Sequence, residues 1–248
     1  MKILVCISHV PDTTSKINFI ENNSKFDKNG VQFIINPNDE FGLTRAIWFK
    51  EKNNARVDVI NVGLQETEAT LRKALAIGAD KAIRINIEPK DSSVVAKSIS
   101  DYISNNNYDL IIAGRESIDY NGGMVPGMIS ALTKINFIDK CIDLNISENS
   151  VLASREIDGG MENISTSLPL IIGGQKGLVE ENDLKIPNMR GIMMARKKEL
   201  LVLDPGNYTD TLETDNFEKP EPKEEVTLVS PDEVEKLIEL LNNEAKAI

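Results

Sequence analysis

A glycine-rich segment at residues 109–132 contains the groups best suited to bind an anion. An apolar run ending at Gly114 leads through a polar loop with Gly122 and Gly123 into a helical pattern. Glycine lets backbone N–H groups approach a phosphate closely, and a helix start adds a favourable dipole. The loop has neither a GxGxxG fingerprint nor a Walker sequence, so on this loop alone a turn without a ligand is an equal alternative.

Two further loops are expected at the same edge of the predicted sheet. The first, Asn36-Pro37-Asn38-Asp39, opens a helical pattern, and the second, Gly63-Leu64, follows an apolar run. In an open parallel sheet, ligands bind beyond the carboxyl ends of strands, where such loops converge. This convergence favours a nucleotide site, although Asn36 and Pro37 taken alone are more simply explained as a helix cap and first helical residue.

The sequence offers no recognisable catalytic or metal-binding set. His9 is the single histidine, and because no nucleophile can be placed beside it, we interpret it as a partly exposed loop side chain. Cys6 and Cys141 lack CxxC or Cys/His spacing. Asp119 fits a phosphate loop at least as well as acid–base chemistry. The chain is therefore predicted not to be an enzyme by itself.

Composition narrows the classes of partner. The 248 residues carry a formal net charge of −11, from 28 Lys and Arg against 39 Asp and Glu. This balance opposes binding to a nucleic-acid backbone. The apolar run at residues 3–7 is too short for a signal peptide or membrane span, so it is expected to be the first strand of a cytoplasmic protein.

The elements that must position these loops alternate along residues 2–135. Short β-branched runs alternate with helical patterns, which is typical of βαβ units and a parallel sheet. Strands are predicted at residues 2–7, 57–62, 82–85 and 109–113. Helices are predicted to open at Asn36, to run through Leu71 to a stop at Gly78, to span residues 92–104, and to follow Gly123.

Beyond residue 136 the pattern changes to shorter runs at 137–144, 150–157 and 163–168. The turn Asp158-Gly159-Gly160 predicts a hairpin, so we expect an antiparallel extension of the same domain. The predicted fold is a doubly wound, mostly parallel α/β sheet of the adenine-nucleotide-binding type, with this extension, within residues 1–203.

Residues 204–248 are predicted to form a separate C-terminal arm. Residues 204–228 are acidic, contain prolines and are poor in apolar groups, so they are expected to be extended. The capping box Ser230-Pro231-Asp232-Glu233 predicts a helix with Val234, Leu237, Ile238 and Leu241 on one face. Such a helix needs a surface, either on its own domain or on a partner.

Several motifs together resemble the electron transfer flavoprotein β subunit family over nearly the whole chain. They are Lys2-Ile-Leu-Val-Cys-Ile with Val10-Pro-Asp-Thr, Asn36-Pro-Asn-Asp, Arg72-Lys-Ala-Leu-Ala-Ile-Gly-Ala-Asp, Ala113-Gly-Arg-Glu-Ser-Ile-Asp, Arg155-Glu-Ile-Asp-Gly-Gly, and Ile186-Pro-Asn-Met with Met194-Ala-Arg-Lys-Lys. Each motif is short, but their order and spacing are specific.

The resemblance implies a heterodimer whose α subunit holds most of the redox FAD, while the β subunit buries a second nucleotide. That nucleotide is AMP in respiratory members and a second FAD in bifurcating members. The implied cofactor-binding residues are Cys6, Asn36, Pro37, Asn38, Asp39, Gly63, Leu64, Asp119, Tyr120, Asn121, Gly122, Gly123, Met124, Val125, Pro126 and Gly127. Met124 replaces the Gln that is usual in the family, and Gly122-Gly123 replace bulkier polar residues.

The resemblance also implies an electron shuttle from acyl-CoA or other dehydrogenases to a quinone-linked or other reductase. Ile186, Pro187, Asn188 and Met189 match the loop that docks on the dehydrogenase; the alternative is a surface loop before a helix capped by Asn188. The expected second nucleotide is AMP, although Val10-Pro-Asp-Thr and Asn36-Pro-Asn-Asp are closer to bifurcating members. A rival hypothesis is a stand-alone regulatory nucleotide-binding module of the universal-stress type.

Overall fold

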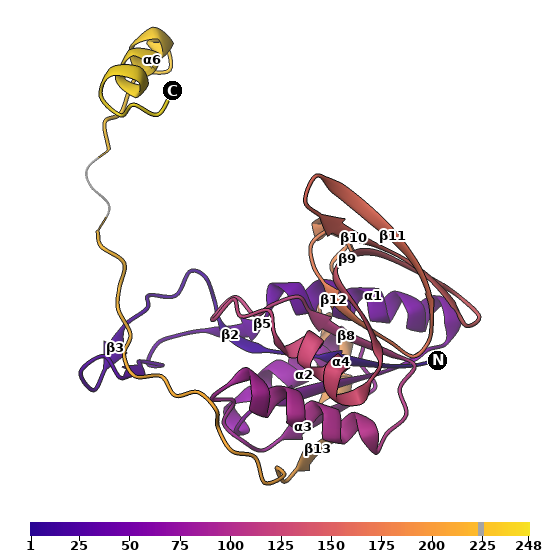
Figure 1. The fold of residues 1–248 in the computed structure, drawn as a ribbon. Coiled ribbons are helices and arrows are strands. Elements are labelled where there is room, and N and C mark those ends of the chain that lie inside the picture. The colour runs from indigo at the N-terminus through magenta and orange to yellow at the C-terminus, as the bar shows by residue number, and fades with distance from the viewer. Residues whose placement is uncertain (223–225) are drawn as a thin grey trace.

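The computed structural model describes residues 1–222 and 226–248, so 223–225 of the predicted arm lie outside the described residues. One nine-stranded sheet forms its centre, in the order β11-β10-β9-β12-β8-β1-β6-β7-β13 (Figure 1). The five predicted or neighbouring strands on the parallel side are β1 (Lys2–Cys6), β6 (Arg56–Val62), β7 (Lys81–Ile85), β8 (Leu110–Gly114) and β13 (Leu200–Leu203). The predicted doubly wound α/β fold is confirmed.

Helices cover both faces of the parallel strands. They are α1 (Pro37–Asn53) and α2 (Glu68–Ile77) on one face, and α3 (Ser92–Ser104) and α4 (Val125–Thr133) on the other. Successive residues of β1 point to opposite faces, so Val5 packs in the core under α1 and α2 while Leu4 packs in the core under α3 and α4. Burial on both faces explains why these strands are continuous apolar runs.

The strand order reverses direction beside β1. β1 pairs in parallel with β6 on one side and with β8 on the other. The chain passes from β1 through α1 to β6, then through α2 to β7, and α3 carries it back across to β8. The carboxyl ends of β1 and β8 therefore flank a topological switch point, which is where ligands bind in such sheets.

The antiparallel extension is also confirmed. It consists of β9 (Asn136–Ser147), β10 (Ser150–Ile157) and β11 (Gly160–Ser167), with Ile157 opposite Gly160 at the predicted hairpin turn. Two strands of the nine-stranded sheet were not predicted. β12 (Leu170–Gly174) lies parallel between β8 and β9, and β13 pairs with β7 at the far edge.

Smaller elements line the carboxyl edge and one side of the sheet. β2 (His9–Pro11) pairs with β5 (Phe33–Ile35), and β3 (Phe19–Ile20) pairs with β4 (Lys25–Phe26). Short 3-10 turns occupy Gln65–Thr67 and Glu181–Asp183, and α5 (Met189–Ala195) packs on α2. Within the described ranges, no helix combines the length and apolar character needed to cross a bilayer.

The arm after β13 is extended and ends in α6 (Val234–Asn243). The predicted capping box at Ser230 is wrong, because the helix begins four residues later with Glu233 at its N-cap and no side-chain capping bond. Ser230 instead begins a turn in which its carbonyl accepts from Glu233 N–H at 2.9 Å. Figure 1 shows α6 standing apart from the body of the molecule.

Candidate functional site

Asp39 joins the two strands that flank the switch point. Its Oδ2 accepts from Ser8 N–H at 2.7 Å, just beyond β1, and its Oδ1 accepts from Gly114 N–H at 2.8 Å, at the end of β8. A Cβ at position 114 would lie 2.4 Å from Asp39 Oδ1, so glycine is required for this approach. Burial raises the pKa of Asp39 to about 7, although the hydrogen bonds from Ser8, Asn36 and Gly114 oppose the rise.

Asn36 holds the loop that follows β8 rather than capping its own helix. It occupies the N-cap position of α1, but its side chain makes no capping bond. Its Nδ2 donates to the Glu116 carbonyl at 2.9 Å and its Oδ1 accepts from Ile118 N–H at 3.1 Å. Asn38 Nδ2 donates to the same Glu116 carbonyl at 3.1 Å. The interpretation of the Asn36 side chain as a helix cap is therefore wrong, because the β8–α4 loop takes both of its polar atoms.

Cys6 and Gly63 lie at the ends of β1 and β6. Burial, followed by the nearby Asp39 carboxyl, raises the pKa of the Cys6 thiol well above its ordinary value, so the thiol stays neutral. Gly63 is buried, and a Cβ there would lie 2.5 Å from Thr67 Cγ2. Beside it, Asn61 Nδ2 donates to the Ile7 carbonyl at 2.8 Å, while Asn61 Oδ1 is buried without a partner among the described residues.

The predicted phosphate loop, residues 119–127, is open and mostly exposed. Asn121 and Gly123 have left-handed backbones, with φ of 50° and 59°. No backbone carbonyl in the described ranges accepts from the N–H of Gly122 or Gly123, and a Cβ at Gly122 would find Ser92 Oγ of α3 at 3.9 Å. The loop contains no Lys or Arg. Its donors therefore fit a phosphate held by backbone N–H groups and by the start of α4.

The predicted cofactor residues thus fall into two groups. Cys6 and the start of α1 lie beside the switch point and Gly63 follows the end of β6, and these residues are buried or half-buried, whereas Leu64, Tyr120 and Met124 are 37%, 69% and 48% exposed. Sequence reasoning did not identify Ser8 or Asn61. Ser8 follows the first predicted strand and Asn61 lies near the end of the second, so both could have been found from their positions.

His9 packs against neighbouring side chains of its own domain. It lies in β2 rather than in a loop, stacks on Phe33 with ring centroids 4.4 Å apart, and its Nδ1 lies 2.7 Å from Thr70 Oγ1. Burial lowers the pKa of the imidazole. Within the part of the chain that the structure describes, no three His, Cys, Asp or Glu side chains are grouped to hold a metal ion.

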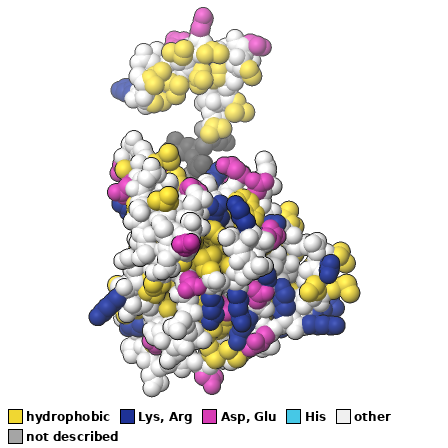
Figure 2. Space-filling model, turned by 90° about the vertical axis from the view of Figure 1, so that its right-hand side faces the viewer, with side chains coloured by type: hydrophobic (Ala, Val, Ile, Leu, Met, Phe, Trp, Pro, Cys, Tyr) yellow, Lys and Arg dark blue, Asp and Glu magenta, His cyan; other side chains and the backbone are white. Residues whose placement is uncertain are grey.

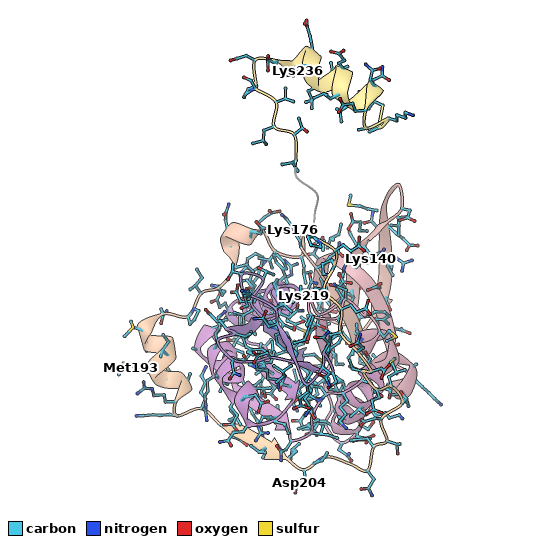
Figure 3. The ribbon with its side chains drawn as sticks, turned by 90° about the vertical axis from the view of Figure 1, so that its left-hand side faces the viewer. Lys140, Lys176, Met193, Asp204, Lys219 and Lys236 are labelled. Carbon is cyan, nitrogen blue, oxygen red and sulfur yellow. The ribbon has the colours of Figure 1, made fainter. Side chains whose placement is uncertain are left out.

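The predicted docking residues lie before and at the start of α5. Ile186 and Met189 are 83% and 75% exposed, and Asn188 caps the helix by accepting from Gly191 N–H at 2.8 Å. The helix-cap interpretation of Asn188 is therefore confirmed. Met193, which sequence reasoning did not single out, projects from the same helix (Figure 3). Its side chain is 66% exposed.

A hollow of about 540 Å³ lies between α2 and α5, bordered by Pro187, Ile192 and Arg196. The guanidinium of Arg72 donates from Nη1 to the carbonyls of Ala195 and Lys198, both at 2.8 Å, so it fixes the end of α5. The exposed loop at Ile186 therefore leads into α5, whose C-terminal end is hydrogen-bonded to α2 through Arg72.

The sequence matches one known family of proteins. The model of the electron transfer flavoprotein domain matches residues 24–206. The chain is 34% identical to the electron transfer flavoprotein subunit beta of Bacillus subtilis (strain 168), over 100% of both chains. It is 33% identical to that of Dictyostelium discoideum, over 83% of this chain and 82% of the relative, and 32% identical to that of Syntrophomonas wolfei, over 80% and 77%. The chain belongs to the electron transfer flavoprotein β subunit family.

Proposed function

We propose that this chain pairs with an α subunit to form an electron shuttle that carries electrons from dehydrogenases to a quinone-linked or other reductase. The observation that supports it most is the family match across the whole length of the chain. FAD, held mainly by the α subunit, supplies the electron-accepting and electron-donating chemistry. This chain contributes the nucleotide-binding loops and the partner-docking surface.

For the second nucleotide, we propose AMP. Loop 119–127 has no basic side chain, so its contacts to an anion come from backbone N–H groups such as those of Gly122 and Gly123 and from the dipole of α4. One phosphate needs fewer such donors than a diphosphate. We place the adenosine beside Cys6 and Gly63, at the ends of β1 and β6. The alternative is a second FAD, as in bifurcating complexes.

The docking surface suits an electron donor such as an acyl-CoA dehydrogenase. Ile186 is an exposed apolar side chain placed before the capped helix α5, and exposed apolar anchors of this kind supply much of the affinity of an interface. Arg196 and Lys197 lie at the end of the same helix and suit an acidic partner.

The test is to express the chain with its α subunit, purify the complex, denature it and quantify the released nucleotides by chromatography. One FAD with one AMP per heterodimer is the expected result. Two FAD without AMP would establish the bifurcating alternative. One FAD with neither AMP nor a second FAD would show that the proposed pocket binds no second nucleotide. Failure to form a flavin-bearing complex would favour the stand-alone regulatory module.

A further inference from the structure

We propose that Asn36, Asn38 and Asp39, here called the α1 clamp, position the phosphate-binding loop instead of touching the nucleotide. This inference rests on the proposed function, because it assigns roles within the same site. The three residues were expected to contact the ligand directly. Five of their six polar side-chain atoms are instead hydrogen-bonded to backbone groups. Four of these bonds reach the end of β8 and the loop just beyond it, and the fifth joins Asp39 to Ser8 beyond β1.

The polar side-chain atoms of Asn36 and Asp39 are all hydrogen-bonded to backbone groups. Both carboxylate oxygens of Asp39 accept backbone N–H groups, from Ser8 and Gly114. Both polar atoms of the fully buried Asn36 are used, by Glu116 O and Ile118 N. Asn38 adds a second bond to the Glu116 carbonyl. The clamp therefore makes one hydrogen bond to residue 114, two to residue 116 and one to residue 118. A buried side chain whose polar atoms are paired gains nothing by exchanging them for a ligand.

The clamp acts on the loop through a short, continuous backbone path. Immediately before the clamped Ile118, the carbonyl of Ser117 accepts from Asn121 N–H at 2.8 Å. Asn121 has a left-handed backbone, with φ of 50°, and leads directly into Gly122 and Gly123. The anchored segment at 116–118 thus determines where the left-handed turn begins, and that turn orients the next N–H groups.

Positioning matters here because the loop has no Lys or Arg that could adjust to a phosphate. Backbone N–H groups bind an anion only when they are already aimed at it, and a loop that must be ordered on binding loses affinity. Asp39 adds a second constraint, because it ties the end of β1 to the end of β8 and so sets the separation of the adenosine and phosphate sides.

The test uses the intact αβ complex and compares four proteins: wild type, Asn36→Ala, Asn36→Asp and Ile47→Val. Asn36→Asp keeps the acceptor for Ile118 N–H but loses the donor to Glu116. Ile47→Val removes a methyl group from the core face of the same helix and controls for a general loss of stability. Bound AMP or second FAD is quantified after gel filtration, and its dissociation rate is measured by exchange with excess nucleotide.

We expect Asn36→Ala to release the second nucleotide about tenfold faster or more, since each net hydrogen bond contributes on this scale. Asn36→Asp should be intermediate, and Ile47→Val and the α-subunit flavin content should not change. If Asn36→Ala does not assemble, Asn38→Ala, which removes a single donor, gives the same measurement. If Asn36→Ala releases the second nucleotide at the wild-type rate, the clamp proposal is wrong and the proposed function stands. A wild-type complex with neither AMP nor a second FAD would overturn the proposed function and the clamp with it.

Discussion

Asp39 is a titratable residue buried beside the carboxyl ends of β1 and β8. It is 3% exposed, and burial raises its pKa from 3.8 to about 7. Between these values the folded chain holds a proton that the unfolded chain releases. The stability that this group contributes is therefore fully present below about pH 4 and is lost as the pH rises through about 7.

Replacing Asp39 with Asn removes this titration. We expect the free energy of unfolding of the wild type, relative to Asp39→Asn, to fall as the pH rises from about 4 to about 7, by on the order of 4 kcal/mol at most. Denaturant unfolding of both proteins at a series of pH values measures the difference. The exposed Asp119→Asn serves as the matched control, and a constant difference across this window would contradict the assignment.

The Ile186 side chain is the residue whose function is easiest to isolate, because it is 83% exposed and its removal disturbs little packing. Ile186→Ala should weaken docking to an electron-donating dehydrogenase by about 2 kcal/mol, or roughly 30-fold in affinity, without changing flavin content. Rates of flavin reduction at increasing complex concentration measure the effect. Leu132→Ala, 50% exposed on α4, should behave as wild type; equal rates for both variants would leave Ile186 as part of a surface loop.

At the scale of single residues, the sequence could predict which residues lie in the loops at the sheet edge but not which groups their side chains bond. Gly63 was predicted at the carboxyl edge of the sheet because it directly follows a predicted strand, and Gly122 because it lies in the loop between a predicted strand and the next helix. The side chain of Asn36, in contrast, bonds to residues 80 and 82 positions away, Glu116 and Ile118. Local pattern favours a helix cap at such a position, and only the tertiary meeting of two loops decides otherwise.

At the scale of elements, Asp91 links helix α3 to the arm. Its Oδ1 accepts from Val94 N–H at 2.8 Å and caps the helix, while its Oδ2 accepts from the Thr211 hydroxyl at 2.9 Å and from Leu212 N–H at 3.1 Å. Burial alone would raise the pKa of Asp91, but the hydrogen bonds from Ser93, Thr211 and Val94 bring it well below its ordinary value. The carboxylate therefore holds the arm as an ion.

Two substitutions separate these roles. Asp91→Ser keeps a residue that caps helices well but loses the second oxygen, whereas Asp91→Ala loses both functions. We expect both variants to expose the arm to limited proteolysis around residues 205–215. We expect Asp91→Ala to lose a further 1 kcal/mol or so of stability through α3. Equal protease resistance of wild type and Asp91→Ser would show that other contacts hold the arm.

Most elements of the parallel sheet could be predicted, because each strand is a buried apolar run and each helix has a clear stripe or stop. The short strands β12 and β13 could not. β13 consists of four residues paired with β7, more than a hundred positions earlier, and nothing in Leu200–Leu203 specifies that partner. At Ser230 the sequence matches a capping box, but the chain forms a turn first and the helix begins at Val234.

For the molecule as a whole, the arm divides into a part that lies on its own domain and a part that leaves it. Figure 3 shows the arm between Asp204 and Lys219 running along the body. Tyr208 donates to Asp101 Oδ2 at 2.6 Å, and Phe217 stacks on Phe19 with ring centroids 4.9 Å apart. Lys219 Nζ donates to Asn18 Oδ1 at 3.1 Å. The arm's first half is thus fixed before α6 begins.

Helix α6 has an apolar face that nothing in Figure 2 covers: the helix at the top of that view displays its apolar side chains. Val234, Leu237 and Ile238 are 57%, 43% and 52% exposed. Exposed side chains of this size at helical spacing are typical of a surface that binds a partner. We propose that the α subunit covers this face.

Deleting residues 229–248 tests this arrangement more cleanly than deletion after residue 205, which would also remove the bonds to Asp91. Burial of a Leu or Ile side chain contributes about 1.5–3 kcal/mol, so the deletion should weaken heterodimer assembly by roughly a hundredfold. Leu237→Ser should have a smaller effect in the same direction, and Glu239→Gln on the same helix should have none. Sedimentation or calorimetric titration with the α subunit gives the dissociation constants, and circular dichroism checks that the α/β body is unchanged. An unaltered dissociation constant for the deletion would place α6 outside the interface and leave its apolar face for some other partner.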